Sequence, residues 1–415
     1  MKTEINSKTY ASILALVISI YFILCTISLF QDSPKIDEYG YHLPVLEGMY
    51  NQGFFNYILG ENYQAANTPL PYLVPYLIAK ALCINPNLYI TRSVNFIFSF
   101  LTILLFIFVM KKISGRLDWS FLIFLFYPYF IKTSFTFYLA LYGVFFLLFS
   151  IYLITKETER RILGAGLSSA AGILSQQFIV AFVPAYFFSV LINKYSKNDY
   201  TGLIKHILFF VPLIVPLILF ILWGGLTHPS MRFHGPNLDM THVTSSFVIL
   251  GGVLLPFTVG KIKSLRFIPA ILIFSTSLLL VLLFSPTHGE YGGLGQVTGY
   301  TYNFITKLKS VSYLLSVLFQ IALCFSGLSI FYVLASDLIS STDKLLFSSS
   351  IFFIIVYFFD NLYSERHLLP LITLLFLLTI PRIQSKWLLK IWIVFQVIFG
   401  SCYFYYWLFI HPSFG

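Results

Sequence analysis

Apolar runs long enough to cross a lipid bilayer as helices recur along almost the whole chain. A helix needs about 20 mostly apolar residues to cross ~30 Å of hydrocarbon, and the runs predict thirteen spans. These are 10–30, 88–110, 117–132, 134–155, 162–176, 178–192, 207–223, 243–260, 267–284, 311–335, 345–360, 367–381 and 391–410. The pattern predicts an all-α, polytopic helical membrane protein with a single domain over residues 1–415.

One further apolar stretch, residues 69–83, lies inside the long connection 31–87 between the first two spans. It is interrupted by Pro69, Pro71 and Pro75, and proline disrupts the interior of a helix. We therefore predict a helix that lies at the membrane interface. A fourteenth span and a re-entrant segment are the alternatives.

Composition supports the membrane class and excludes several others. Hydrophobic residues make up 58% of the 415 residues and charged residues only 10%, whereas soluble domains are roughly a quarter charged. A soluble enzyme, a disordered protein and a secreted disulfide scaffold are excluded. The four cysteines lie far apart, without the spacing of a zinc site, a redox pair or a disulfide framework.

The distribution of basic residues predicts the topology. If the N-terminus is cytoplasmic, 18 of the 26 Lys and Arg residues fall on the cytoplasmic side, as the positive-inside rule requires. The net charge of +10 is then explained by topology, and a nucleic-acid partner is excluded. We predict a multi-pass protein of the cell membrane in a prokaryote, or of the endoplasmic reticulum membrane in a eukaryote.

Acidic and histidine side chains gather on the opposite, external side. The first external loop opens with the adjacent carboxylates Asp37 and Glu38, followed by His42. Two acids this close to hydrocarbon are costly unless they are partnered or used in a reaction. They are therefore candidate catalytic residues. Ordinary acids on a solvated loop are the alternative.

Later external segments carry candidate ligands for an anionic oxygen. Arg232 and His234 lie in the loop 224–242, and Arg366 and His367 stand where the span 367–381 begins. Cations at headgroup depth suit a lipid phosphate, although an interfacial arginine can also simply reach towards water. The histidine spacings match no compact zinc motif, so neither a metal nor a cofactor is indicated, although a divalent metal is not excluded. Gln176 is a weaker polar candidate on the same side.

Several segments together resemble the GT-C superfamily, membrane glycosyltransferases that use polyprenyl-phosphate-linked sugars. Within it, the chain resembles the α-1,2-glucosyltransferases that add the last glucose to the dolichol-linked oligosaccharide. The matching segments are DEYGYHLPVLE (37–47), NTPLPYLV (67–74), Arg92-Ser93-Val94-Asn95, Gly224-Gly225 and Arg366 before Leu368-Leu369-Pro370. Where that family has an RQTN-like stretch, this chain has Ser175-Gln176-Gln177-Phe178 without the arginine.

The resemblance implies a GT-C fold with interfacial helices in the first external loop, and a hexosyltransferase activity. The donor would be a polyprenyl-phosphate-linked sugar, and the acceptor a lipid-linked glycan or another molecule on the external side. Asp37 matches the general base, and Glu38 would orient the acceptor or tune Asp37. The remaining candidates would bind substrate: His42, Arg232, His234, Arg366, His367 and Gln176. One base without a second carboxylate nucleophile implies inversion at the anomeric carbon.

Two other functions are alternatives to a glycosyltransferase. A transporter or flippase of lipid-linked sugars would place charged sites near the bilayer midplane, but no acid falls in the middle of a predicted span. A polysaccharide polymerase or ligase would use external Arg and His residues without needing Asp37 and Glu38. The substitution Asp37→Asn therefore distinguishes the three.

Overall fold

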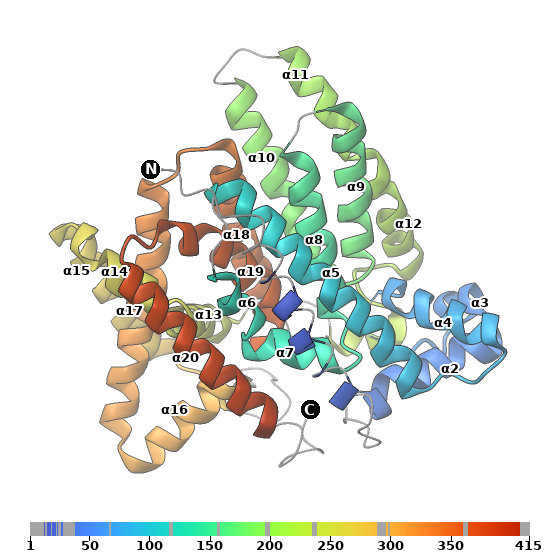
Figure 1. Ribbon diagram of the computed structural model, residues 1–415, viewed down its shortest axis with the longest axis horizontal. Coiled ribbons are helices and arrows are strands. Elements are labelled where there is room, and N and C mark those ends of the chain that lie inside the picture. The colour runs from blue at the N-terminus through green and yellow to red at the C-terminus, as the bar shows by residue number, and fades with distance from the viewer. Residues whose placement is uncertain are drawn as a thin grey trace. The chain divides into compact units, whose positions relative to one another are not determined.

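The computed structural model shows a chain of helices (Figure 1). It describes residues 12, 15–17, 19–21, 23, 26, 27, 38–65, 68–115, 119–155, 158–195, 200–234, 239–288, 296, 297, 299–359 and 364–406. Among these, the only strands are β1 (Thr287–His288) and β2 (Gln296–Val297), which pair in parallel with Thr287 opposite Gln296. The all-α prediction is confirmed.

The contacts divide the chain into two compact units. Unit 1 comprises Met1–Gln177, Ile207–Arg232 and Ile393–Gly415, and unit 2 comprises Phe178–His206 and Phe233–Trp392. Each unit is described by itself below. The assignment of residues 1–415 to a single glycosyltransferase domain stays a prediction.

Within the described residues, six helical stretches are long and apolar enough to cross a membrane. They are α5 (Leu88–Ser114), Gln177–Lys194, Leu203–Trp223, α15 (Phe267–Phe284), α17 (Tyr313–Ser336) and α20 (Lys386–Tyr405). Two bent helix pairs raise the number to eight if each pair is one span. The chain is thus a multi-pass helical membrane protein.

The thirteen predicted spans outnumber the six to eight that the described helices can form. Three of the predicted spans correspond to helices of fewer than 18 residues: α9 (Glu159–Ile173), α18 (Ser341–Tyr357) and α19 (Leu369–Thr379). Much of the span 10–30 lies outside the described residues. The difference arises because an apolar run predicts burial in lipid but not the length of one continuous helix.

The segment 117–132, predicted as one span, is divided between two short helices. The structure has α6 (Phe121–Leu125) and α7 (Pro128–Phe135) there, and α7 meets α8 (Ala140–Ile154) at a bend of 111°. Pro128 lacks the backbone N–H that would continue α6, so a new helix starts at this residue. The turn after α7 brings residues 136–139 to Glu38, in the connection 31–87. This connection and the loop 224–242 are called below by their predicted names, the first and the second external loop.

Unit 1 is built around α5, which packs against α8, while α8 packs against α9. In turn α9 contacts the 3₁₀ turn Val211–Leu213, which leads into α12 (Ile214–Trp223). Figure 1 shows the short helices of the first external loop gathered near one end of α5. These are the π-helical turn Glu38–His42, α2 (Leu43–Gln52), α3 (Phe54–Leu59) and α4 (Leu70–Leu82).

The first external loop forms a packed layer. Its helix α4, in the stretch predicted as interfacial, has 13 residues and is about 20 Å long, too short to cross the hydrocarbon. Leu46, Met49, Tyr63 and Tyr72 are buried together in one apolar cluster. Fully burying a large apolar side chain contributes roughly 1.5–3 kcal/mol, so this cluster holds the loop in one conformation.

Unit 2 contains the remaining helices, with α17 packed against both α13 and α15, and α18 packed against α10 and α19. Its shorter helices are α10 (Phe182–Tyr195), α11 (Tyr200–Lys205), α13 (Met240–Val253), α14 (Leu255–Lys261) and α16 (Tyr300–Val311). The α13–α17 contact depends on Gly251, where a Cβ would overlap the backbone of Leu323. Small residues permit such close approach between membrane helices.

Candidate active site

The structure describes the predicted site residues unevenly. Asp37 lies outside the described residues, and so do the side chains of Arg232 and His234, whose backbone forms the 3₁₀ turn Pro229–His234. Glu38, His42 and Gln176 belong to unit 1. Arg366 and His367 belong to unit 2.

Glu38 forms a buried ion pair with Arg92 of α5. The Arg92 guanidinium donates from Nε to Oε1 at 3.0 Å and from Nη2 to Oε2 at 2.6 Å. The backbone N–H of Phe137 also donates to Oε1, at 2.8 Å. Glu38 is 0% and Arg92 4% exposed. A bidentate pair with an added backbone donor can compensate such a buried carboxylate.

This ion pair holds Glu38 in place, and Glu38 is the next residue after Asp37 in the sequence. Glu38 is held by α5 through Arg92 and by the turn after α7 through Phe137. The backbone at Glu38 is thereby tied to two elements of unit 1. Any catalytic role of Glu38 itself stays a prediction.

His42 lies in an aromatic layer next to this ion pair. Its Nδ1 and the Tyr72 hydroxyl share a hydrogen bond of 2.8 Å. Edge-on rings of Phe137 and Tyr138 lie 5.6 and 6.0 Å from the imidazole centroid. Burial raises the pKa of the Tyr72 phenol, and Tyr57 and Tyr138 raise it further. Tyr72 therefore stays protonated at physiological pH.

A stripe of polar residues on α5 supports the same region. Arg92, Asn95 and Ser99 recur at helical spacing and are all buried. The Asn95 amide donates to the carbonyl oxygens of Thr133, at 3.0 Å, and of Thr136. These bonds hold the break between α7 and α8 against α5. The spacing of the stripe was a usable sequence signal for Arg92, which our sequence analysis did not assign to the site.

Lys132 is a second residue that the sequence analysis missed. It lies on α7 and is buried, five residues before the Phe137 amide that contacts Glu38. A buried lysine in a bent helix pair of a membrane protein is a functional candidate, because burying its charge is costly. In the sequence it stands at the end of an ordinary apolar run, so no local signal distinguished it.

The beginning of α4 caps the end of α9, close to Gln176. The Thr68 hydroxyl donates to the Ile173 carbonyl at 2.9 Å, and the Leu70 N–H donates to the Leu174 carbonyl at 2.9 Å. Gln176 is buried two residues further on. These bonds satisfy carbonyls that an ending helix leaves open. They also place Gln176 beside the first external loop.

The second external loop also folds onto the first. The Trp223 indole donates to the Ile58 carbonyl at 3.1 Å, and the Ser230 hydroxyl donates to the Tyr63 carbonyl. His228 is buried, with its ring 5.3 Å from Tyr63 and its Nδ1 2.8 Å from the Ser230 hydroxyl. Unit 1 thus brings together segments near residues 38–42, 68–72, 92–95, 136–138, 173–177 and 223–230.

In unit 2, Arg366 and His367 lie in a 3₁₀ turn, Glu365–Leu368, immediately before α19. The His367 N–H donates to the Ser364 carbonyl at 2.9 Å, and its own carbonyl accepts from the Tyr357 hydroxyl. The imidazole lies 5.6 Å from the Phe178 ring. Arg366 is half-buried. The turn therefore has a defined conformation at the end of α18.

Glu365 caps the first turn of α16. Its Oε1 accepts the N–H groups of Thr301 at 2.7 Å and Tyr302 at 3.1 Å, and its Oε2 accepts the Thr301 hydroxyl at 3.1 Å. The carboxylate is fully buried. A negative charge at a helix N-terminus is favoured by the exposed N–H groups and the helix dipole. Gly299 permits this approach, with φ +148° and no side chain to occupy the space of the carboxylate.

Gly299→Ala is expected to lower the free energy of unfolding by roughly 2–4 kcal/mol. The new Cβ would overlap the buried Glu365 carboxylate, and the backbone conformation is itself strained for alanine. Gly115→Ala is the matched control, because Gly115 has φ +65° but nothing within 4 Å of its Cβ position. We expect a markedly larger fall in the thermal unfolding midpoint for Gly299→Ala. Equal falls would show that the Glu365 contact contributes nothing.

The fold and these networks define a multi-pass helical membrane protein with buried polar clusters at the ends of its helices. No family model and no curated protein matches the chain. Among solved structures, the chain is similar to ArnT from Cupriavidus metallidurans in the apo state. The match covers 95% of this chain and 78% of that one, with a TM-score of 0.43 and 10% identity. The function proposed below rests on the site residues.

Proposed function

We propose that this chain is an inverting membrane glycosyltransferase of the GT-C type. It moves a sugar from a polyprenyl-phosphate-linked donor to a lipid-linked glycan or another acceptor on the external side. The supporting observation is the buried ion pair of Glu38, the residue that follows Asp37 in the sequence. Glu38 accepts three hydrogen bonds inside unit 1 from Arg92 and Phe137. Asp37 is thus the carboxylate of the pair assigned to the reaction.

The proposed reaction is a single displacement. The acceptor hydroxyl oxygen attacks the anomeric carbon while the bond between that carbon and the phosphate oxygen breaks. Asp37 takes the hydroxyl proton, and the polyprenyl phosphate leaves with the electron pair. A phosphate leaving group needs little protonation, so the remaining task is to stabilise its growing charge. No metal or cofactor is part of this proposal.

Several cations are candidates to stabilise the departing phosphate. The sequence assigns Arg366 and His367 to this role, with Arg232 and His234 as further candidates. The buried Lys132 of α7 joins them, since it lies on the helix that leads to Phe137. Charge-assisted hydrogen bonds from such groups are roughly twice as strong as neutral ones.

The choice of sugars and acceptors to test rests on the family resemblance alone. A hexose, with glucose first, on a dolichyl or undecaprenyl carrier is the donor to test first. His42 and Gln176 are proposed as acceptor contacts, because His42 belongs to the layer formed by the first external loop and Gln176 lies beside it. The protein would act in the cell membrane or the endoplasmic reticulum membrane.

The direct test is transfer of a radiolabelled sugar from a panel of polyprenyl phosphates by membranes that contain the protein. We expect label in a lipid-extractable or glycan product, dependent on the chain. A lipid-linked sugar that crosses the bilayer unchanged would instead support a flippase. That alternative is favoured by the 111° break between α7 and α8, since transporters often place their sites at broken helices.

Arg366→Ala is expected to raise the KM for the lipid-linked donor about 10–100-fold. The reason is loss of a charged hydrogen bond to the phosphate, worth roughly 1.5–3 kcal/mol. Lys309→Ala, on an exposed face of α16 in the same unit, is the charge-matched control and should leave KM unchanged. Donor titrations with both purified variants make the comparison. An unaltered KM in Arg366→Ala would remove this residue from the donor site.

A further inference from the structure

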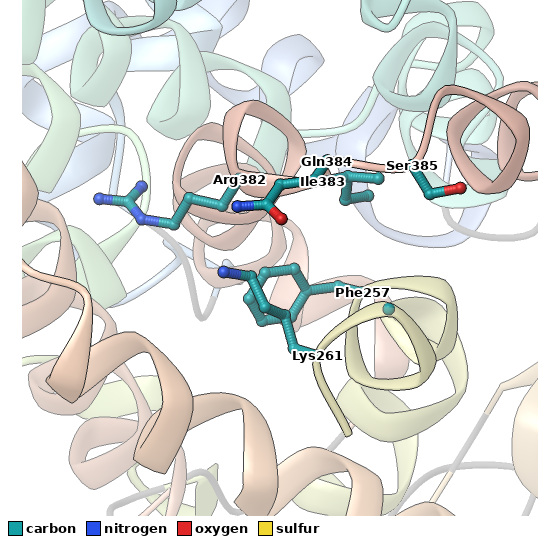
Figure 2. A pocket seen from close by; sticks show the side chains of 7 residues that line it. Phe257, Lys261, Arg382, Ile383, Gln384 and Ser385 are labelled. Carbon is teal, nitrogen blue, oxygen red and sulfur yellow. The ribbon is translucent and has the colours of Figure 1, made fainter. Parts of the chain in front are cut away.

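A pocket lies in unit 2 on the side where the basic loops are predicted to face the cytoplasm. It is lined from the end of α14 by Phe257, Gly260 and Lys261, and from the connection between α19 and α20 by residues 382–385. Its cavity volume is about 20 Å³, and the wider hollow of about 230 Å³ around it includes open solvent. Figure 2 shows the Lys261 amine and the Gln384 amide on facing walls.

The arginine of this pocket is already engaged. Arg382 Nη2 pairs with Asp343 Oδ1 at 2.9 Å, and Nη1 donates to the Leu378 carbonyl at 2.7 Å. Asp343 also accepts the Ser340 N–H at 3.0 Å, within a capping box at the start of α18. Arg382 therefore fixes the wall of the pocket, and its charge is compensated.

Lys261 is differently placed. Its Nζ lies 3.0 Å from Asp337 Oδ2, but the Asp337 side chain is 36% exposed, and an ion pair this exposed is weak. An ammonium group has three N–H donors, of which this carboxylate takes one. Lys261 therefore supplies a cation inside the pocket that can bind an anionic oxygen.

The start of α20 adds a second attraction for an anion. Ser385 caps this helix by accepting the Leu388 N–H at 3.2 Å, and Ser385 also lines the pocket. The N-terminus of a helix of 20 residues favours negative charge through its open N–H groups and its dipole. A Cβ on Gly260 would lie only 2.9 Å from Leu388 Cδ2, so α14 and α20 meet closely beside the pocket.

The surroundings are strongly basic. The connections 261–266, 336–344 and 381–390 carry seven basic residues against two acids, which gives an excess of five positive charges. The basic residues are Lys261, Lys263, Arg266, Lys344, Arg382, Lys386 and Lys390, and the acids are Asp337 and Asp343. Such a cluster on a membrane protein attracts anionic headgroups.

Apolar side chains next to the pocket indicate a lipid as the source of the anion. Phe267 is 79%, Trp387 72% and Ile262 52% exposed, and each lies within six residues of a pocket residue. Exposed aromatic residues at a helix end are typical of the membrane–water interface. Phe257 and Ile383 add an apolar wall inside the pocket. A soluble phosphate would not need these surfaces, whereas the glycerol and acyl parts of a phospholipid would cover them.

We propose that this pocket binds the phosphate of an anionic phospholipid of the cytoplasmic leaflet, through Lys261, Gln384 and the start of α20. The binding site lies in unit 2 and is independent of the proposed transfer reaction. A bound lipid would connect α14 with the beginning of α20.

The test uses the purified full-length protein in nanodiscs of phosphatidylcholine alone or of an equal mixture with phosphatidylglycerol. Native mass spectrometry should show retained phosphatidylglycerol and a higher thermal unfolding midpoint in the mixture. Lys261→Gln should weaken retention about five-fold, the effect of one charge near a headgroup, and Gln384→Leu should weaken it a few-fold. Lys307→Gln, on exposed α16, is the charge-matched control and should leave retention unchanged.

Three outcomes would overturn the proposal. Equal losses in Lys261→Gln and Lys307→Gln would show that general surface charge attracts the lipid. Competition by millimolar inorganic phosphate, without any preference for phosphatidylglycerol over phosphatidylcholine, would show a site for free phosphate. Unchanged retention in both Lys261→Gln and Gln384→Leu would exclude the pocket. Because Lys261→Gln keeps an amide that can donate to Asp337, we expect this variant to fold.

Discussion

Replacing Asp37 by asparagine is expected to lower sugar transfer about 10²–10⁴-fold while the protein still inserts and folds. Asparagine preserves the size of aspartate and most of its hydrogen bonds but cannot accept the proton of the acceptor hydroxyl. Loss of a general base has this magnitude in other enzymes. The Glu38–Arg92 ion pair is untouched by the substitution, so the backbone at Glu38 should stay fixed. The measurement is the initial rate of transfer at saturating donor.

The controls separate basicity from general effects of charge. Glu61→Gln removes an exposed acid of the same external loop. It should leave the rate within two-fold, which corresponds to about 0.4 kcal/mol in activation free energy. If Asp37→Asn keeps near-full activity while Glu38→Gln abolishes it, the roles of the two acids are exchanged. If both variants stay active, the acidic pair is a surface feature and the glycosyltransferase proposal fails.

The second large effect is expected on stability. Arg92→Met should lower the free energy of unfolding by roughly 3–5 kcal/mol, because it leaves the carboxylate of Glu38 buried without its partner. Glu38 is 0% exposed, so water does not replace the guanidinium. The thermal unfolding midpoint in detergent, with the fraction of monodisperse protein, measures this loss.

The double variant Arg92→Met with Glu38→Gln tests the cause. A neutral glutamine can still accept the Phe137 N–H and carries no uncompensated charge, so most of the lost stability should return. This non-additivity is what a double-mutant cycle detects for residues in contact. Simple addition of the two single effects would contradict the assignment of the pair as one unit. Transfer activity should recover with stability if Glu38 only anchors Asp37.

The class of the protein could be predicted from the sequence, because a segment that crosses hydrocarbon must be a long and mostly apolar helix. Runs such as 88–110 and 267–284 have no other stable environment than lipid, and both are long helices in the structure. The helix expected at 69–83 was also found, as α4. The break before α8 was not predicted, although Pro128 was a usable signal. An apolar run does not show where its axis turns.

The site was harder to predict, because its partners are far apart in the chain. Arg92 meets Glu38 across 54 residues, and Glu365 meets Thr301 across 64. The sequence indicated that Asp37 and Glu38 needed partners at that depth, but not that Glu38 would be buried against α5. The sequence did not point to Glu365, since a carboxylate that caps a distant helix has no local pattern.

The contact between Gly299 and Glu365 restricts how relatives of this chain can vary. A methyl group at position 299 needs the space that the long Glu365 side chain fills, whereas the shorter aspartate at 365 would leave that space empty. Positions 299 and 365 should therefore change together, with glycine accompanying glutamate. Insertions and deletions between β2 and Gly299 would be tolerated only where they preserve the glycine at the start of α16. Covariation between these two positions would mark relatives that keep this helix cap beside the arginine at 366.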